Sequence, residues 1–426
     1  MSYPSIVFHI MPDTRFSILK ALAILLVVLS HAGISGWLSG VVYSFHVPVF
    51  FLCAGYFFHT KYLADERTYV VHRVRGIYFP FLRWSILFLL LHNLFFSLGI
   101  LSETYGNAAG GVPHPYTWHQ AMQHLWSIVF NMSGYDPFLG GAFWFFRAYL
   151  LASFGFLLLF KLLRFTHRFD NNIQAGWGIF GVAMGLITWK ITEGLTLTGV
   201  AQGGYRELMG IGLMALGFLM RQYEVLTRLN WKVAAGALAL LLLSASFFPT
   251  SMAWNPDFAT FISLPLPAVT GFLVLLYIAQ WLNGKEGWVK RGLSYIGTHT
   301  LYIFAFHLLA FKVVSALKVA WYDLPWEAVG GHPVVNQPAN NVLWVLLYLL
   351  AGVPLPLLGQ RVYAYVAARV TLTQQEVVDY LVIGFKVLGK LCFLLCLILI
   401  RLLKRAYQSV VRGMKEIIAA SNPKDE

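Results

Sequence analysis

The chain has 426 residues, of which 58% are hydrophobic and only 12% are charged. Because soluble domains carry about 25% charged residues, this composition excludes an ordinary soluble protein and indicates an integral membrane protein. The formal net charge of +13 does not indicate nucleic-acid binding, because the basic residues stand in short clusters between apolar runs. The three cysteines lie inside apolar runs without a CxxC or Cys/His cluster, so we expect no structural disulfide and no metal site.

Long apolar runs divide the chain. Runs long enough to cross a bilayer fall near residues 17–38, 41–59, 77–100, 140–163, 174–195, 205–221, 231–250, 258–283, 293–320 and 341–360, with a further one near 379–403. They predict an all-α bundle of about ten transmembrane helices within residues 1–370. Residues 371–426 are predicted to form a C-terminal helical extension with a basic cytoplasmic tail.

The distribution of Lys and Arg predicts the orientation of the bundle. Apart from one mixed connection, basic connections alternate with three that contain no Lys or Arg, at 101–139, 251–257 and 321–340. The positive-inside rule then places the N-terminus and the basic loops in the cytoplasm. If the run 379–403 also crossed, the basic residues from Arg401 onward would lie outside. We therefore expect this run to lie along the inner surface as an amphipathic helix; the alternative is that one earlier run does not cross.

The first apolar run carries two ionisable side chains on one helical face. Lys20 and His31 are eleven residues apart, which is three turns of an α-helix and a rise of about 16 Å. One helix would thus align a cation at the membrane surface with an imidazole near the midplane of the bilayer. A buried histidine often only bonds a neighbouring helix, but neutral imidazole is also well suited to take a proton from a hydroxyl near pH 7. His31 and Lys20 are our candidate catalytic residues.

A basic cluster precedes the third apolar run. His72, Arg73 and Arg75 stand close together in the cytoplasmic connection, where guanidinium groups could hold the phosphates of a ligand. A plain topology signal or contact with anionic lipids accounts for such a cluster equally well. The residues alone leave these interpretations open.

Two further ionisable residues lie inside apolar runs. Arg147 needs a carboxylate, a carbonyl or water as its partner, and Glu193, Glu207 and Asp136 are the candidates. His307 is a second imidazole inside a span. Both are predicted to support the site formed around His31.

The first outer segment (residues 101–139) and the second outer segment (residues 321–340) are rich in aromatic, acidic and histidine residues, among them Asp136 and His332. Aromatic rings that stack on sugar CH faces, together with groups that bond hydroxyls, make a carbohydrate-binding surface. An aromatic belt at the membrane interface has the same composition. Both interpretations stay open.

Several of these residues fall in motifs of a known family. Lys20, ten intervening residues and His31 resemble the R/K-x10-H signature of the acyltransferase-3 family of integral-membrane O-acyltransferases. Further motifs similar to those of the family follow in the same order: FHVPVFFLCAGYFF (45–58, with His46), the loop ending in Arg73, Arg75 and Pro80, FWFFRAYLL (143–151, with Trp144 and Arg147), YIGTHTLYIFAFH (295–307) and VPLPLLGQRVYAYV (353–366). The resemblance covers about residues 13–370.

The resemblance implies a membrane enzyme that moves an acyl group, usually acetyl from acetyl-CoA on the cytoplasmic side, to a hydroxyl of a glycan or lipid-linked glycan. Arg73, Arg75 and His72 would then hold the CoA phosphates, and His31 would deprotonate the acceptor hydroxyl or carry the acyl group briefly. Supporting and substrate-side roles would fall to Arg147, His307, His46 and Trp144. The family also implies a bacterial inner membrane, with membrane lipids as partners.

The residues also allow two other classes of function. A multi-pass transporter of a solute or lipid-linked glycan would use His31 in a proton relay and would consume no acyl-CoA. A membrane sensor or scaffold would tolerate His31→Ala. The sequence shows no internal repeat, which counts against an inverted-repeat transporter.

Overall fold

The computed structural model describes residues 13–106, 111–196 and 201–368, and beyond them only Arg401, Arg405, Gln408, Ser409 and Arg412. Helices are the regular elements of these residues and no strand occurs among them, which confirms the all-α class. The chain divides into two units, residues 1–360 and 361–426, and the following description concerns the first. Apart from Arg401, the run 379–403 lies outside the described residues, and the boundary after residue 370 stays a prediction.

Seven helical segments of the described part are long and apolar enough to cross a membrane, which confirms a multi-pass membrane protein. They are Thr14–His31, Gly36–Tyr56, Glu66–Ser97, Trp144–Phe165, Phe258–Asn283, Thr300–Trp321 and Val342–Ala367. A shorter apolar helix covers Trp231–Phe247. The expected number of about ten crossings stays a prediction.

The first helix, α1 (Thr14–His31), is shorter than the apolar run that predicts it. It begins after the N-cap residue Asp13, whose side chain accepts from the backbone N–H of Arg15, and it ends at His31. The expectation of one helix through residue 38 is wrong, because Gly33 adopts a φ of +88° and interrupts the helix before α2 (Gly36–Phe45) begins. His31 therefore occupies the C-terminal end of α1, on the same helix as Lys20, as the spacing predicts.

Proline divides three of the other predicted spans. The pairs are α2 and α3 (Pro48–Tyr56), α12 (Phe258–Ser263) and α13 (Pro265–Asn283), and α16 (Val342–Gly352) and α17 (Pro354–Ala367). Each second helix begins with a proline, which lacks a backbone N–H and fits the first helical turn. The predicted span 293–320 is likewise divided, at His299, into α14 (Trp288–Thr298) and α15 (Thr300–Trp321).

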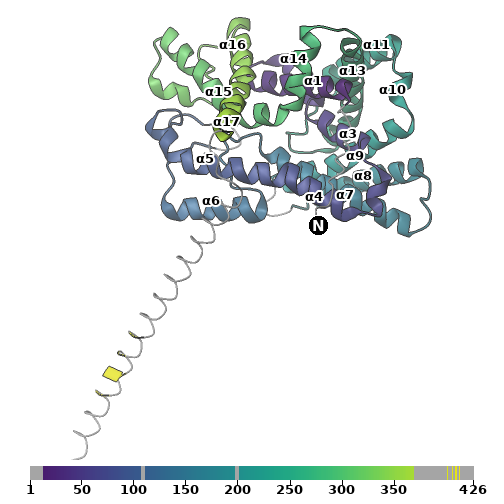
Figure 1. Cartoon of the computed structure of the whole chain (residues 1–426), viewed down its shortest axis with the longest axis horizontal. Helices are drawn as coiled ribbons and strands as arrows, with labels where there is room; N and C mark the ends of the chain where they lie inside the picture. Colours follow the sequence, from purple (N-terminus) through teal and green to yellow (C-terminus); the bar gives the residue numbers. More distant parts are fainter. Residues whose placement is uncertain are drawn as a thin grey trace, which may run out of the picture. The chain divides into compact units, whose positions relative to one another are not determined.

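Helix α1 lies in the middle of the bundle and contacts α13, α14, α15 and α16 (Figure 1). A second group forms around α9 (Tyr205–Gln222), which packs against α3, α7 (Trp144–Phe165) and α8 (Asn172–Thr192). Glycines allow the closest approaches: a Cβ at Gly217 of α9 would collide with the backbone of Leu52 in α3, and one at Gly297 of α14 with that of Ser17 in α1. Small residues at such crossings are typical of membrane helices.

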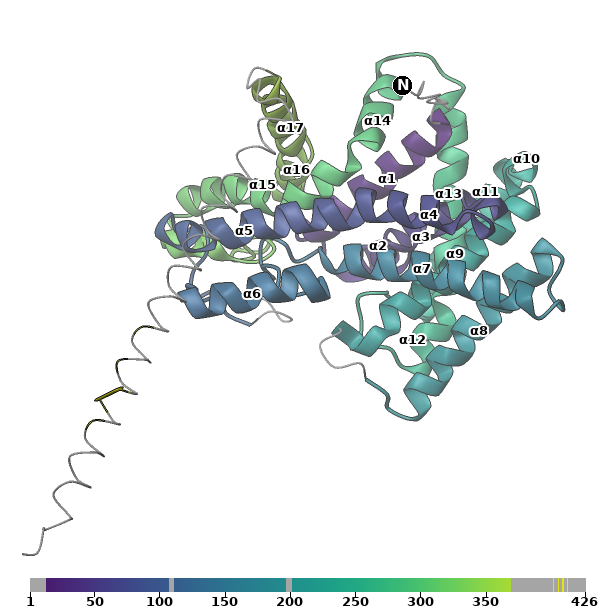
Figure 2. The same ribbon diagram turned by 60° about the horizontal axis from the view of Figure 1, so that its bottom comes forward.

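The remaining elements connect or flank these groups. Helix α4 (Glu66–Arg73), the π-helical turn η2 (Val74–Tyr78) and α5 (Phe79–Ser97) follow one another along one line, and α6 (Trp118–Asn131) lies beside α5 (Figure 2). Helix α11 (Trp231–Phe247) packs against α2 and α13. Short helices complete the described chain: η1 (Thr60–Leu63), η3 (Ala201–Gly204), α10 (Val225–Arg228) and η4 (Trp326–Gly330).

Candidate active site

The hydrogen bonding of His31 fixes which ring nitrogen is free. Its Nδ1 lies 2.9 Å from the carbonyl oxygen of Val27, one turn earlier in α1. A carbonyl oxygen can only accept, so Nδ1 carries a hydrogen, and in the neutral ring Nε2 then carries the lone pair. This is the neutral form of imidazole that accepts a proton.

The His31 ring lines a cavity of about 120 Å³ between α1, α2, α3, α7 and α15. Its polar lining residues are His31, Tyr43, His46, Ser251 and Thr300, and the rest of the wall is largely apolar. A mostly apolar cavity with a few polar groups is typical of a small-molecule site. The cavity therefore places His31 beside a space that a substrate could occupy.

His46 faces the same cavity from the end of α2. Its Nδ1 lies 2.6 Å from the carbonyl oxygen of Val42, so its Nε2 also carries the lone pair. The ring of Tyr43 lies 5.2 Å from that of His46 and 6.5 Å from that of His31, between centroids. His46, for which we expect a supporting role, thus lies in the cavity wall.

His307 brings a third imidazole to this region. Its ring centroid lies 5.2 Å from that of His31, although the two residues are on α15 and α1. Its Nδ1 donates to the carbonyl oxygens of Phe304 and Ile303 at 2.9 and 3.1 Å. Its Nε2 is buried and has no hydrogen-bond partner among the described residues. The sequence indicates a histidine inside each helix but not that the two meet.

Trp144 forms part of the cavity wall at the start of α7. The guanidinium of Arg206 lies 4.0 Å from the centre of its indole ring. Arg206 also donates to the side chain of Gln202 at 2.8 Å and to the carbonyl oxygen of Ala253 at 3.2 Å. The indole is therefore held against the cavity by a cation–π contact.

Arg147 lies one turn further along α7 but does not line the cavity. Its Nε donates to Oε1 of Glu207 at 3.2 Å, and both side chains are largely buried. Of the three carboxylates considered from the sequence, Glu207 is thus the one that pairs with Arg147. Asp136 pairs instead with His92.

The basic residues predicted to hold a phosphate ligand divide between two environments. Arg73 is half-buried between Tyr69 and Tyr149, with its guanidinium 5.0 and 5.4 Å from the two ring centres. His72 and Arg75 are exposed. Successive residues of a helix point about 100° apart, so neighbours in sequence need not share a face. A ligand would have to reach more than one side of the α4–η2 segment to contact all three residues.

Lys20 is half-buried and lies near enough to Cys53 of α3 to act on its thiol electrostatically. Neither Lys20 nor the three basic residues of the α4–η2 segment is part of the cavity wall. Among the described residues, no three His, Cys, Asp or Glu side chains are placed to hold a metal ion.

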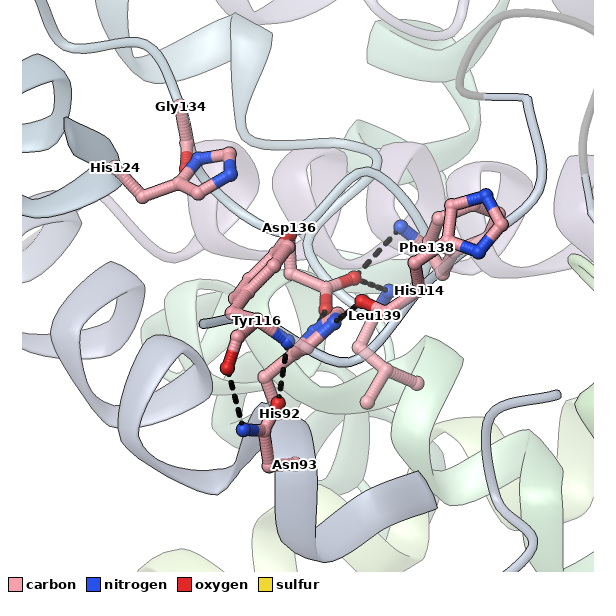
Figure 3. Close-up of polar contacts among 9 residues, drawn as sticks. All are labelled: His92, Asn93, His114, Tyr116, His124, Gly134, Asp136, Phe138 and Leu139. Carbon is pink, nitrogen blue, oxygen red and sulfur yellow. Dashed lines mark hydrogen bonds and ion pairs between the residues drawn. The ribbon is translucent and has the colours of Figure 1, made fainter. Parts of the chain in front are cut away.

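The first outer segment is anchored by a buried ion pair that the sequence does not reveal. Nδ1 of His92 lies 2.6 Å from Oδ2 of Asp136, and its Nε2 lies 3.0 Å from the carbonyl oxygen of His114 (Figure 3). Oδ1 of Asp136 accepts from the backbone N–H of Phe138 and of Leu139, each at 2.8 Å. Both ring nitrogens of His92 thus lie within hydrogen-bond distance of an oxygen, and the ring bridges Asp136 and the backbone of His114.

Tyr116 reinforces this anchor. Its ring stacks on that of His92 with 3.7 Å between centroids and 4° between planes. Its backbone N–H and C=O both bond the side chain of Asn93, at 2.7 and 2.8 Å (Figure 3). Polar side chains of α5 thereby fix two separate stretches of the first outer segment.

Two buried lysines of α15 fix the second outer segment. Lys312 donates to the carbonyl oxygens of Val329 and Gly331 at 3.0 and 2.8 Å. Lys318 binds the part of the segment that follows, through the carbonyl oxygens of Val335 and Pro338 and the side chain of Asn340, at 2.8, 2.6 and 2.6 Å. The signal in the sequence is a pair of lysines inside an apolar run, each of which needs polar partners.

The comparisons with known proteins agree with this architecture. A family model described as an acyltransferase domain matches residues 13–361. No curated protein and no solved structure matches the chain. The matched residues include His31, His46, Trp144 and His307. The match confirms the family resemblance expected from the motifs, and it confirms that the protein is an enzyme and not a transporter or scaffold. The chain therefore belongs to the acyltransferase-3 family, and it is a membrane acyltransferase.

Proposed function

We propose that the enzyme transfers an acyl group, most simply acetyl, from acyl-CoA on the cytoplasmic side to a hydroxyl of a glycan or lipid-linked glycan on the other side of the membrane. The N-terminus is then cytoplasmic and the membrane is a bacterial inner membrane. The observation that carries the proposal is the free Nε2 of His31 at the wall of a cavity, with Nδ1 held by the carbonyl oxygen of Val27.

The proposed reaction is an acyl transfer from sulfur to oxygen. The acceptor oxygen forms a bond to the thioester carbonyl carbon, and the carbon–sulfur bond of acyl-CoA breaks. Nε2 of His31 takes the proton of the hydroxyl and delivers it to the departing thiolate, so no other reactant is needed. An alternative order, in which His31 carries the acyl group briefly, would produce a labelled protein in the presence of donor alone.

On the donor side, we assign the phosphates of CoA to Arg73 and Arg75, with His72 and Lys20 in support. Guanidinium groups suit phosphate oxygens, and these residues lie on the face that the positive-inside rule places in the cytoplasm. The tyrosines on both sides of Arg73 fix its guanidinium in one orientation. Arg75 is exposed and free to reach a ligand from solution.

On the acceptor side, we assign the cavity wall to the glycan. Trp144 offers an aromatic face that can stack on a sugar ring, and its contact with Arg206 keeps that face in place. His46 and Tyr43 supply polar groups in the same wall. His307 and the pair of Arg147 with Glu207 support the helices from which these groups project.

The test is to reconstitute the protein in liposomes with acetyl-CoA and a mixed glycolipid fraction, and to measure the free thiol of released CoA. Release by the wild type should fall at least about a hundredfold in His31→Ala, the usual scale for the loss of a general base. The matched control is His119→Ala, because His119 is an exposed histidine of α6 away from the cavity. It should keep wild-type activity.

Thermal unfolding of all three proteins is measured alongside the assay, because their rates can be compared only if the proteins are equally folded. Equal CoA release by wild type and His31→Ala would remove His31 from the centre of the reaction. No release by the wild type with any acceptor would reject glycan O-acetylation by acetyl-CoA and leave the acyl donor to be found among longer acyl-CoA thioesters.

A further inference from the structure

The middle of the first outer segment, residues 116–136, begins and ends at neighbouring residues of α5. At one end, the side chain of Asn93 bonds both the backbone N–H and the C=O of Tyr116, at 2.7 and 2.8 Å. At the other end, Nδ1 of His92 lies 2.6 Å from Oδ2 of Asp136 (Figure 3). Both ends of this stretch therefore lie at one level of α5, and residues 116–136 form a hairpin, which we call the α6 hairpin.

The far end of the α6 hairpin lies well along α5. Helix α6 has 14 residues, which gives a rise of about 21 Å, and it runs beside α5 (Figure 2). Near its end, the hydroxyl of Tyr78, just before α5, donates to the carbonyl oxygen of Val129 at 2.7 Å. Tyr78 and Asn93 both belong to the candidate span Glu66–Ser97. A hydrocarbon core is about 30 Å thick, so a hairpin of this length enters a membrane without crossing it.

The returning part of the hairpin is short and is not helical. Met132 adopts a φ of +49°, and α6 ends before it. Residues 132–136 then lead back to the level of His92. An extended chain covers about 3.3–3.6 Å per residue, so these few residues are long enough to retrace most of α6.

Side chains and backbone of the protein satisfy polar groups of this return. Nδ1 of His124 in α6 donates to the carbonyl oxygen of Gly134 at 2.9 Å. The backbone N–H of Ser133 donates to the carbonyl oxygen of Ser127 at 3.2 Å. Non-helical backbone is tolerated at membrane depth only where protein or an internal cavity, and not lipid, surrounds it. The return has contacts of the kind that this condition requires.

The outward face of α6 is apolar. Trp118, Met122, Trp126 and Phe130 follow one another at every fourth residue and are 36–78% exposed. We call these four residues the α6 stripe. Ile128, on the opposite face of the helix, is buried in the cluster that α6 shares with α5.

The surface beside the α6 stripe is also apolar. Helix α5 exposes Leu87, Leu90 and Leu94 on one of its faces, and exposed leucines of a span contact acyl chains. Of the polar residues of α6, Gln123 donates from Nε2 to Nε2 of His119 at 3.0 Å, which lowers the cost of placing both near hydrocarbon. The stripe thus continues an apolar surface that faces lipid.

We propose that the α6 hairpin is a re-entrant segment, inserted into the bilayer from the side of the first outer segment, and that the α6 stripe contacts the acyl chains of the lipids on that side. The insertion requires that α5 crosses the membrane and does not depend on the reaction. Ala142 and Trp144, which follow the hairpin, line the cavity of His31. The hairpin therefore connects the outer surface with the cavity wall inside the membrane.

Spin labels at single cysteines measure the depth of the stripe. The full chain is reconstituted in liposomes after its three cysteines, Cys53, Cys392 and Cys396, are replaced by alanine. The labelled variants are Trp118→Cys, Met122→Cys, Trp126→Cys and Phe130→Cys, with Leu90→Cys as the lipid control and Glu103→Cys as the water control. Glu103 is an exposed residue of the same outer segment, outside the hairpin. Each label is tested for collisions with oxygen, which concentrates in hydrocarbon, and with a water-soluble nickel chelate.

The ratio of oxygen to nickel collisions should rise from Trp118→Cys to Phe130→Cys. At Trp126→Cys and Phe130→Cys it should exceed the ratio at Glu103→Cys by at least about tenfold, because hydrocarbon excludes polar solutes. Ratios at these two positions that match Glu103→Cys would overturn the proposal. Exclusion of both reagents, together with spin–spin broadening, would show that a second copy of the chain covers the stripe, and it would overturn the proposal as well.

A second measurement uses the unaltered chain, so it does not depend on how the variants fold. The wild type is reconstituted with a phosphatidylcholine that carries a diazirine near the end of one acyl chain, irradiated, and analysed by peptide mass spectrometry. Adducts should form on Trp126 or Phe130 as well as on Leu90. Adducts on Leu90 without any on the α6 stripe would show that lipid does not reach α6 and would reject the insertion.

Discussion

The buried pair of His92 and Asp136 allows a prediction in which each hydrogen bond can be followed. Both side chains are 1% exposed, so water cannot replace a lost partner. Oδ2 of Asp136 faces Nδ1 of His92 at 2.6 Å, and Oδ1 accepts from two backbone N–H groups at 2.8 Å each. Removing the carboxylate and removing only its charge should therefore have very different effects on the free energy of unfolding.

Asp136→Asn leaves every group with a partner. The amide oxygen accepts from the two backbone N–H groups, and the amide nitrogen donates to Nδ1 of His92. The ring then keeps its hydrogen on Nε2 and still donates to the carbonyl oxygen of His114. Because only the charge assistance is lost, we expect destabilisation of about 1 kcal/mol.

Asp136→Ala leaves two backbone N–H groups and Nδ1 of His92 buried without their partner. We expect destabilisation of about 3–5 kcal/mol, the usual effect of removing one partner of a buried ion pair. The matched control is Glu103→Ala. Glu103 also pairs with a histidine, His114, at 3.0 Å, but the two side chains are 62% and 69% exposed, so the change should stay within about 0.5 kcal/mol.

The free energies of unfolding of the wild type and the three variants are measured by reversible unfolding in mixed micelles. Circular dichroism follows unfolding as the mole fraction of SDS is raised. Asp136→Ala should be far less stable than Asp136→Asn, and Glu103→Ala should be close to wild type. Equal losses in the two Asp136 variants would refute this expectation, since the amide would then satisfy the buried partners no better than the methyl group does.

Two further predictions concern packing and pH. Gly217→Ala should destabilise by about 1–3 kcal/mol, because its Cβ would collide with the backbone of Leu52, whereas Gly181→Ala in α8 meets nothing within 4 Å and should be neutral or slightly stabilising; equal effects in the same SDS titration would contradict the α3–α9 packing. Burial, with the charges of Lys312 and His31 in addition, lowers the pKa of His332 from 6.5 to about 3, against an opposing effect of the Asp136 carboxylate. Below pH 6.5 the unfolded chain therefore binds a proton at His332 that the folded chain does not bind. The free energy of unfolding contributed by neutral His332 is fully present above pH 6.5 and falls by up to about 1.4 kcal/mol per pH unit as the pH drops toward 3. His332→Asn should flatten this dependence between pH 6 and pH 4, and an unchanged slope would argue against a buried neutral ring.

The sequence predicts the helical class and the shared helix of Lys20 and His31 because both follow from hydrophobicity and helical spacing. It does not predict that α1 ends at His31, since an apolar run continues past the point where Gly33 turns the chain. Hydropathy reports which residues avoid water, and it contains little information on backbone direction. The proline-divided helices differ from their predicted runs for the same reason.

The sequence predicts even less well which groups the ionisable side chains pair with. Three carboxylates were equally suitable for Arg147, and only the packing of α7 on α9 selects Glu207. The neighbourhood of His31 and His307 depends on the crossing of α1 and α15, which no spacing within either helix specifies. Which ring nitrogen carries the lone pair depends in turn on a contact with the carbonyl oxygen one helical turn earlier. Only the structure shows that contact.

The two buried lysines of α15 have a consequence for how the second outer segment can change. Four of their five acceptors are main-chain carbonyl oxygens, of Val329, Gly331, Val335 and Pro338, and every amino acid supplies the same group. These hydrogen bonds therefore do not depend on most of the side chains of the segment. Residues between these points should therefore be exchangeable in a library without releasing the loop, so the sequence of this segment can vary while α15, which holds it, stays as it is.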